Sequence, residues 1–236
     1  MIFEYNWQAS LATLAIVVAT VTIGRFILFK VPAFRETLLK NKAENKKKYR
    51  NKKKYPHRIK SSQQVALATN FVLFAAVLPF FATFKTQSIW EILLNSFLIL
   101  MVYDFFYYMT HRFVFHGKGY FRRVHAVHHQ ARTPTSIDSL LLDPMEAFIG
   151  IALFIVVTAA VSLVMGEPLN IATHVITIVI YTQINQLNHV HVELDRFPYK
   201  TVNWIANKHA IHHIDMHKGN YATITLLFDR MFGTLD

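Results

Sequence analysis

Residues 89–116 read IWEILLNSFLILMVYDFFYYMTHRFVFH, an apolar run that continues without a break into two histidines. The part up to Met109 has about the 20 apolar residues that a helix needs to cross the hydrocarbon core of a bilayer. His111 and His116 follow directly. The stretch therefore predicts a membrane-spanning helix that carries histidines to one membrane surface.

Further apolar stretches occupy four other parts of the chain, at residues 9–29, 65–84, 147–165 and 170–187. Each has roughly the length of a membrane span, and the last is the least apolar. A signal peptide is the alternative for the first stretch, but it lacks a basic leading region and a small-residue cleavage site. We therefore expect an all-α fold, an integral-membrane bundle of about four or five transmembrane helices with a cytosolic helical cap.

The charges of this hydrophobic chain are concentrated in one segment. Hydrophobic residues make up 53% of the 236 residues, yet the net charge is +11. Lysines and arginines gather between the first two spans, at Lys40, Lys42, Lys46, Lys47, Lys48, Arg50, Lys52, Lys53, Lys54, Arg58 and Lys60. Attraction to anionic lipid headgroups is one interpretation and a nucleic-acid patch another. We favour a solvated cytosolic loop over residues 31–63, with no nucleic acid as partner.

Topology follows from this basic segment, because short loops rich in Lys and Arg stay on the cytosolic side. Residues 85–88 turn the second and third spans into a hairpin, and residues 147–187 form a second membrane hairpin. Residues 110–146 and 188–236 then share the cytosolic side. We expect N-terminal membrane helices over residues 1–109 and a catalytic region over residues 110–236.

Histidine is abundant and cysteine is absent. Twelve of the thirteen histidines lie between His111 and His217. The absence of cysteine excludes disulfides, thiolate-ligated iron–sulfur clusters and thiolate-ligated haem. The candidate metal ligands are His111, His116, His125, His128, His129, His189, His191, His209, His212 and His213. His57 is interpreted as a solvated side chain and His174 as a core residue.

Two of these groups share the spacing His-x-x-His-His, at residues 125–129 and 209–213. On a helix, residues three and four apart lie on one face, so each group is expected to aim three imidazoles in the same direction. Neutral imidazole suits iron, zinc and copper. About eight to ten nitrogens are too many for one ion, which predicts a site for two metals.

His111 and His116 are five residues apart, which is about 140° around an ideal helix. We therefore expect the helix to end or distort between them. Asp104 lies seven residues before His111. It is a candidate acceptor for a hydrogen bond from a ligand imidazole. A polar patch at the membrane edge is the alternative.

The residues around the histidines indicate the class of reaction. Zinc activates water but not O2, and a zinc hydrolase commonly places a carboxylate in the same motif. Here the residues inside the triads are Ala126, Val127, Ala210 and Ile211. An all-nitrogen, apolar-lined site for two metals is better suited to attack on an unactivated C–H bond.

The carboxyl-terminal half resembles the fatty acid hydroxylase/sterol desaturase superfamily. The residues that carry the resemblance are Asp104–Arg112, His125–His129, His209–His213, Asn220–Ala222 and Phe228–Thr234. The resemblance implies two Fe ions, O2 as co-substrate and a separate electron donor such as cytochrome b5, a ferredoxin or a reductase. Zinc in a purified sample is compatible with this prediction, since zinc binds nitrogen sites more tightly than ferrous iron. His217 and Asn220 join Asp104 as candidates for supporting the ligands.

Two features of the sequence depart from the family pattern. The first histidine group encloses four residues where many members have three, which is more like the fatty acid 2-hydroxylase and carotenoid hydroxylase branches. Ala222 stands where glycine is common.

The predicted function is hydroxylation of a fatty acyl, sterol or other membrane lipid. The predicted location is the bacterial inner membrane or the endoplasmic reticulum. A lipid desaturase and a membrane metal-binding or transport protein are the alternatives.

Overall fold

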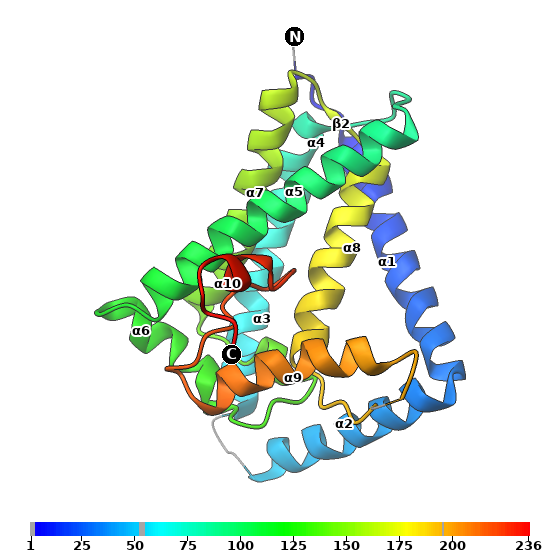
Figure 1. Cartoon of the computed structure of the whole chain (residues 1–236). Helices are drawn as coiled ribbons and strands as arrows, with labels where there is room; N and C mark the ends of the chain where they lie inside the picture. The colour runs from blue at the N-terminus through cyan, green and yellow to red at the C-terminus, as the bar shows by residue number, and fades with distance from the viewer. Residues whose placement is uncertain (1–2, 52–54, 195) are drawn as a thin grey trace.

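A computed structural model describes residues 3–51, 55–194 and 196–236, and it is built almost entirely of helices (Figure 1). Within these residues, four helical segments are long and apolar enough to cross a membrane. They are α1 (Trp7–Lys30), α3 (Tyr55–Val72) with its continuation through η1 (Leu73–Val77) and α4 (Leu78–Phe81), α5 (Ile89–Met109) with η2 (Thr110–Phe115), and α7 (Pro144–Met165). The prediction of an all-α membrane bundle is confirmed.

The fifth predicted span forms α8 (Ile171–Asn188), which packs against α1 and α5. It is not among the four segments that meet both the length and the apolarity of a span. His174 on this helix is buried, and its Nε2 lies 2.9 Å from the carbonyl oxygen of Phe81. It is therefore a core residue, as its isolated position in an apolar stretch predicted.

Local sequence fixes where the central helices begin and end. Ser88 caps α5, and the Glu91 side chain bonds back to the Ser88 amide in a reciprocal capping box. Asp143 caps α7 and Pro144 occupies its first turn, where the missing N–H is not needed. Gly166 ends α7 with a φ of 75°, a conformation that glycine adopts without strain. These caps determine where α5 and α7 begin and where α7 ends.

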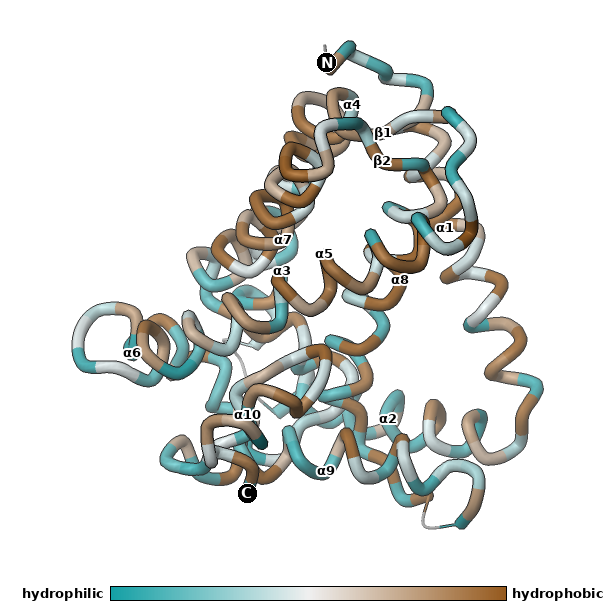
Figure 2. Tube along the Cα trace, turned by 45° about the horizontal axis from the view of Figure 1, so that its top comes forward, coloured by the Kyte–Doolittle hydropathy of each residue, from teal (hydrophilic) through white to brown (hydrophobic). Residues whose placement is uncertain are grey.

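The apolar surface is divided between a narrow core and a wide outer face. Ile99, Tyr103 and Phe154 belong to a buried cluster where α5 meets α7. Val164 and Trp90, by contrast, are 85% and 77% exposed, and apolar residues run along the outside of the spans (Figure 2). Contiguous exposed apolar surface of this extent belongs in lipid rather than in water. The chain is a multi-pass membrane protein.

The basic segment is not the loop that the sequence suggested. Residues 32–51 form the helix α2 (Pro32–Asn51), and α3 begins at Tyr55, while Lys52, Lys53 and Lys54 lie outside the described residues. The prediction was wrong because a lysine-rich sequence is also a good helix former, and polar contacts hold this helix in place. One of them joins Asn41 Nδ2 to the carbonyl oxygen of His191, at 2.9 Å.

Among the described residues, five further short helices lie toward the end of the bundle where α2 lies (Figure 1). They are α6 (Tyr120–His125), η3 (His128–Gln130), η4 (Asp138–Leu140), α9 (Lys200–Ile214) and α10 (Leu227–Met231). At the opposite end, β1 (Ala82–Thr83) pairs in parallel with β2 (Leu169–Asn170). The helical cap therefore lies at the end of the spans where the histidines are found.

Candidate metal centre

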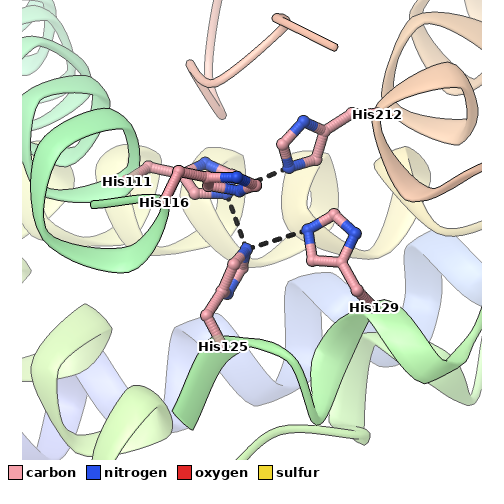
Figure 3. Close-up of side chains that lie close together, drawn as sticks. All are labelled: His111, His116, His125, His129 and His212. Carbon is pink, nitrogen blue, oxygen red and sulfur yellow. Dashed lines mark hydrogen bonds between the residues drawn. The ribbon is translucent and has the colours of Figure 1, made fainter. Parts of the chain in front are cut away.

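Nine of the ten predicted ligands meet in two groups, in each of which one ring nitrogen per histidine lies within 4.8 Å of all the others. The five-histidine group consists of His111, His116, His125, His129 and His212 (Figure 3). The four-histidine group consists of His128, His189, His209 and His213. Every member except His116 and His209 is buried. Each group can hold one metal ion.

The first histidine pair is brought together by a π-helix. The segment η2 (Thr110–Phe115) follows α5 without interruption, and the amide of His116 donates to the carbonyl of His111 at 3.0 Å, five residues back. Because a π-helix closes hydrogen bonds between residues five apart, it places these two residues above one another. The expected distortion of the helix is confirmed, and it serves to bring both rings into the five-histidine group.

Each His-x-x-His-His motif divides its rings between the two groups. His125 and His129 belong to the five-histidine group, whereas His128 belongs to the other. The motif on α9 does the reverse, with His209 and His213 in the four-histidine group and His212 in the five-histidine group. Three imidazoles aimed in one direction was therefore the wrong prediction. In each motif, the first and last histidines, which are four residues apart, belong to one group, and the histidine between them belongs to the other.

Six of the nine rings are fixed through Nδ1 by an oxygen acceptor. In the five-histidine group, three rings are held by carbonyls of residues 215–226, which we call the C-terminal loop. Tyr221 holds His111 at 2.7 Å, Met216 holds His116 at 2.9 Å and Gly219 holds His212 at 2.8 Å. In the four-histidine group, Leu141 holds His128 at 3.2 Å and Asn185 holds His189 at 2.7 Å. The sixth acceptor is the carboxylate of Glu146, which holds His125 at 2.8 Å.

These anchors determine which nitrogen faces the centre. A carbonyl oxygen only accepts, so an Nδ1 bound to it carries the proton, and the Nε2 of the neutral ring has a bare lone pair. His111 and His212 nevertheless point Nε2 at each other at 3.2 Å, and His128 and His189 do so at 3.0 Å. No proton lies between two such acceptors. A cation between them satisfies both, so the donor set fits a metal ion.

The distances agree with this interpretation. An imidazole nitrogen lies about 2.0–2.1 Å from a bound transition metal, so two ligands at right angles lie about 3.0 Å apart. Contacts between Nε2 atoms fall between 2.9 and 3.2 Å in both groups. Examples are His111 with His125 in the five-histidine group (Figure 3) and His209 with His213 in the other. Both groups therefore have the dimensions of a coordination shell.

Burial keeps the rings neutral. Loss of solvent lowers the pKa of His116 to about 3 and the pKa values of His189 and His212 to about 4. The pKa values of His128 and His209 lie well below their usual range for the same reason, with neighbouring imidazoles as a second cause. Neutral imidazole is the form that binds metal, so the environment selects the ligating state.

Two buried aspartates shape the loop that supplies the carbonyls. Asp104 accepts from the amides of Thr223, Ile224 and Thr225 at 2.8–2.9 Å. Asp229 accepts from the amides of Tyr221 and Ala222, both at 2.8 Å. Asp104 was a candidate acceptor for a ligand imidazole, but its observed partners are these three amides and the hydroxyl of Thr225.

Three other predicted residues have roles or positions that differ from expectation. His191 is exposed, with its Nε2 2.9 Å from the Glu193 carboxylate, and neither histidine group includes it. His217 is exposed as well, and its amide bonds to Asp215. Asn220 is buried and links the loop to the carbonyl of Lys208, again through backbone. None of the three has an observed contact with an imidazole of the two groups.

Glu146 is the functional residue that sequence reasoning missed. The search for a carboxylate was confined to residues near the triads, whereas Glu146 lies on α7 and reaches His125 through the fold. A signal was present: this residue is an acidic side chain at the start of an otherwise apolar span. Ionisable residues in such segments are rare and commonly functional.

A cavity of about 210 Å³ extends from the histidines between α3, α5, α7 and α8. His111, His128, His189 and His209 all contribute to its lining. Glu146 lines the end near the histidines, and Phe154 lies eight residues, or about 12 Å, further along α7. The cavity therefore changes from polar to apolar as it enters the membrane-spanning part of the bundle.

Among the aromatic residues of α5 and η2, Tyr103 and Tyr107 border this cavity. Tyr108 and Phe115 are fully buried in packing, while Phe106 and Phe113 are about half exposed at 48% and 56%. The exposed pair suits the membrane–water interface, where aromatic side chains are enriched. The α5 aromatics thus divide between interface, core and cavity.

The fold and the site together define a class: a helical membrane protein in which two clusters of histidine can each hold a metal ion beside a cavity that enters the membrane-spanning helices. The chain belongs to the fatty acid hydroxylase family, which it matches over residues 96–234, more than half of its length. The match includes all nine histidines of the two groups. The resemblance seen in the sequence is confirmed.

The chain is similar to curated proteins named as methylsterol monooxygenases and very-long-chain aldehyde decarbonylases. It is 26% identical to methylsterol monooxygenase 2-2 of Arabidopsis thaliana over 71% of this chain and 64% of the relative. It is 27% identical to the very-long-chain aldehyde decarbonylase GL1-11 of Oryza sativa over 61% and 54%. It is 29% identical to methylsterol monooxygenase 1 of Rattus norvegicus over 57% and 44%. The four-residue spacing of the first histidine group had instead suggested the fatty acid 2-hydroxylase and carotenoid hydroxylase branches.

The chain spans less than two thirds of the length of these relatives. No solved structure matches it significantly.

Proposed function

We propose that this chain is a membrane oxygenase that uses two iron ions, O2 and external electrons to hydroxylate a C–H bond of a lipid. The convergence of nine imidazoles in two groups beside a cavity between the membrane-spanning helices carries the proposal. The similarity to proteins named as methylsterol monooxygenases supports it. Residues 110–236 then form the catalytic region.

The five-histidine group would hold one iron ion and the four-histidine group the other. Nitrogen ligands suit iron, and bound iron would supply the activation of O2 that redox-inert zinc does not supply. Zinc binds nitrogen sites more tightly than ferrous iron, so zinc in a purified sample is compatible with the proposal. The role of the protein is to keep the rings neutral, oriented and dry.

The cavity supports a lipid as the substrate. Phe74, Tyr103 and Phe154 line its inner part and exclude water, which suits a hydrocarbon chain or ring. Glu146 and Asn185 line the part near the histidines and provide hydrogen-bonding atoms. We therefore propose that the lipid enters laterally from the bilayer with its polar portion nearest the histidines.

Turnover in isotopically labelled O2 tests the reaction. Protein reconstituted with iron in lipid vesicles and supplied with a reductant should yield a lipid heavier by one oxygen atom derived from O2. A lipid lighter by two hydrogens would identify a desaturase instead. Oxygen derived from water, or equal activity of the zinc-loaded protein, would contradict the oxygenase proposal. Metal flux across the vesicle membrane without lipid oxidation would support the transport alternative.

We also propose that the histidine end faces the cytosol, where a separate electron carrier reaches it. The support is α2, whose lysines lie at this end, and the rule that short basic segments remain cytosolic. The chain has no cysteine, so Thr133→Cys and Lys85→Cys can be labelled without background. Thr133→Cys should react from the cytosolic side only and Lys85→Cys from the other. Reaction of Lys85→Cys from the cytosolic side would reverse the orientation.

A further inference from the structure

Glu146 is an acidic side chain in direct contact with the metal centre. Its Oε1 lies 2.8 Å from Nδ1 of His125, and the two side chains are only 4% and 1% exposed. Its Oε2 is buried without a hydrogen-bond partner. A carboxylate that is both buried and half satisfied is costly to keep, so it calls for a function.

The position of Glu146 in α7 favours the ionised form of its carboxyl group. It is the third residue of the helix, after the cap residue Asp143 and Pro144. The positive end of the helix dipole favours a carboxylate in this first turn. A glutamate at this position commonly bonds back to the amide of the cap residue. Here it is turned toward His125 instead.

The two histidine groups differ in the kind of acceptor that holds their rings. The other five anchored rings bind backbone carbonyls, including the rings of His128 and His189 in the four-histidine group. A carboxylate on Nδ1–H orients an imidazole and raises the basicity of its Nε2 more than a neutral carbonyl does. His125 is thus the strongest donor among the anchored rings. Its negative partner also offsets the charge of a bound cation.

We propose that Glu146 is a positioning residue that holds His125 and makes the five-histidine group the tighter of the two metal sites. The inference rests on the proposed binding of two metal ions. It goes further by stating which site fills first and which side chain causes the difference.

Metal titration of the full chain in detergent tests the inference. Protein stripped with a chelator is titrated with Co²⁺, and binding is followed by calorimetry and by the visible absorption of the bound ion. The wild type should bind two ions in two steps. Glu146→Ala should weaken the tighter step about 10- to 100-fold and shift the absorption of that ion. Glu146→Gln keeps an acceptor for Nδ1 without the charge, so its affinity should be intermediate.

Two further backgrounds assign the affected site. His209→Ala disables the four-histidine group, and Glu146→Ala added to it should still weaken the remaining ion. His212→Ala disables the five-histidine group, and Glu146→Ala added to it should change nothing. Glu167→Ala is the matched control, because this glutamate lies at the far end of α7 and pairs with Lys85.

Equal weakening in both backgrounds, or unchanged affinity in the His209→Ala background, would overturn the inference. Thermal unfolding of the metal-free Glu146→Gln variant should match the wild type. A large loss of stability there would show a structural role and would also overturn it. Binding of fewer than two ions by the wild type is a different failure, since it removes the proposed two-metal site itself.

Discussion

The five-histidine group and the four-histidine group share the same two sequence motifs but are held in place differently. The five-histidine group depends on carbonyls far along the chain, such as Tyr221, which binds His111 across 110 residues. In the four-histidine group, His189 binds the carbonyl of Asn185 only four residues back. The observed anchors of one group therefore come mostly from the C-terminal loop, whereas those of the other are the carbonyls of Leu141 and Asn185.

This difference gives the C-terminal segment a specific role. Carbonyls of Met216, Gly219 and Tyr221 orient three of the five rings, and Asp104 with Asp229 holds the loop from two sides. The loop contributes no ligand of its own. It acts as a scaffold, so damage to it should affect the two sites unequally.

Removal of one ligand from each group should have the largest effect. His212→Ala and His128→Ala should each abolish lipid oxidation and lower the bound metal, because each removes a buried nitrogen from a different group. Metal content by mass spectrometry and product analysis provide the measurement. His57→Ala is the control, since this exposed histidine lies outside both groups. Full activity of either ligand variant, or loss of metal from the control, would contradict the assignment.

Substitution of the loop aspartate should have the next largest effect and should separate the two groups. Asp104→Ala leaves the amides of Thr223, Ile224 and Thr225 without their acceptor. Each buried donor left unpaired costs about 1–3 kcal/mol, so unfolding should become easier by several kcal/mol. Where the protein still folds, the five-histidine group should lose affinity and the four-histidine group should keep it.

Thermal unfolding and two-step metal titration measure these effects. Asp215→Ala is the control, because this exposed aspartate caps a single amide, that of His217. Equal weakening of both groups in the Asp104→Ala variant would show that the loop does not act selectively.

Sequence reasoning reached the spans and the histidines because both depend on local patterns. The third span was expected to end at Met109, where α5 ends, and nine of the ten proposed ligands meet in the two groups. Whether they bind metal remains a prediction. The division of each triad between two sites could not be predicted, because it depends on how the tertiary fold brings α6, η3 and α9 together.

The supporting residues were harder to predict than the rings. Asp104 was identified as important, but its partners lie 119 to 121 residues away and are backbone amides. Glu146 is separated from His125 by 21 residues and a turn. Such contacts are set by the packing of helices, which no spacing rule in the sequence describes. The clue for Glu146 was its type in an apolar span rather than its distance from a motif.

Acidification should weaken both groups to a moderate extent. Burial lowers the pKa of His116 to about 3 and that of His189 to about 4, whereas an unfolded histidine titrates near 6.5. Below about pH 6.5 the unfolded chain therefore binds more protons than the folded one, so stability is full above that pH and falls as the pH drops toward 4. Bound metal should be released over the same range.

Thermal unfolding of metal-free protein and metal release, both measured between pH 7 and pH 4, provide the test. Unchanged stability across that interval would show that the rings are not held neutral by burial. Release of metal from only one group would show that the two environments differ in more than their anchors.

Substitution of His191 should have the smallest effect and should mark the boundary of the four-histidine group. His191 is only two residues from His189, yet its ring points to solvent and its Nε2 contacts Glu193. The backbone of the same residue binds Asn41 on α2, a contact that His191→Ala leaves intact. Surface ion pairs contribute at most about 1 kcal/mol, so stability should change little. Metal content and lipid oxidation should match the wild type, while His189→Ala should lose both; loss of one ion in the His191→Ala protein would place this ring in the site after all.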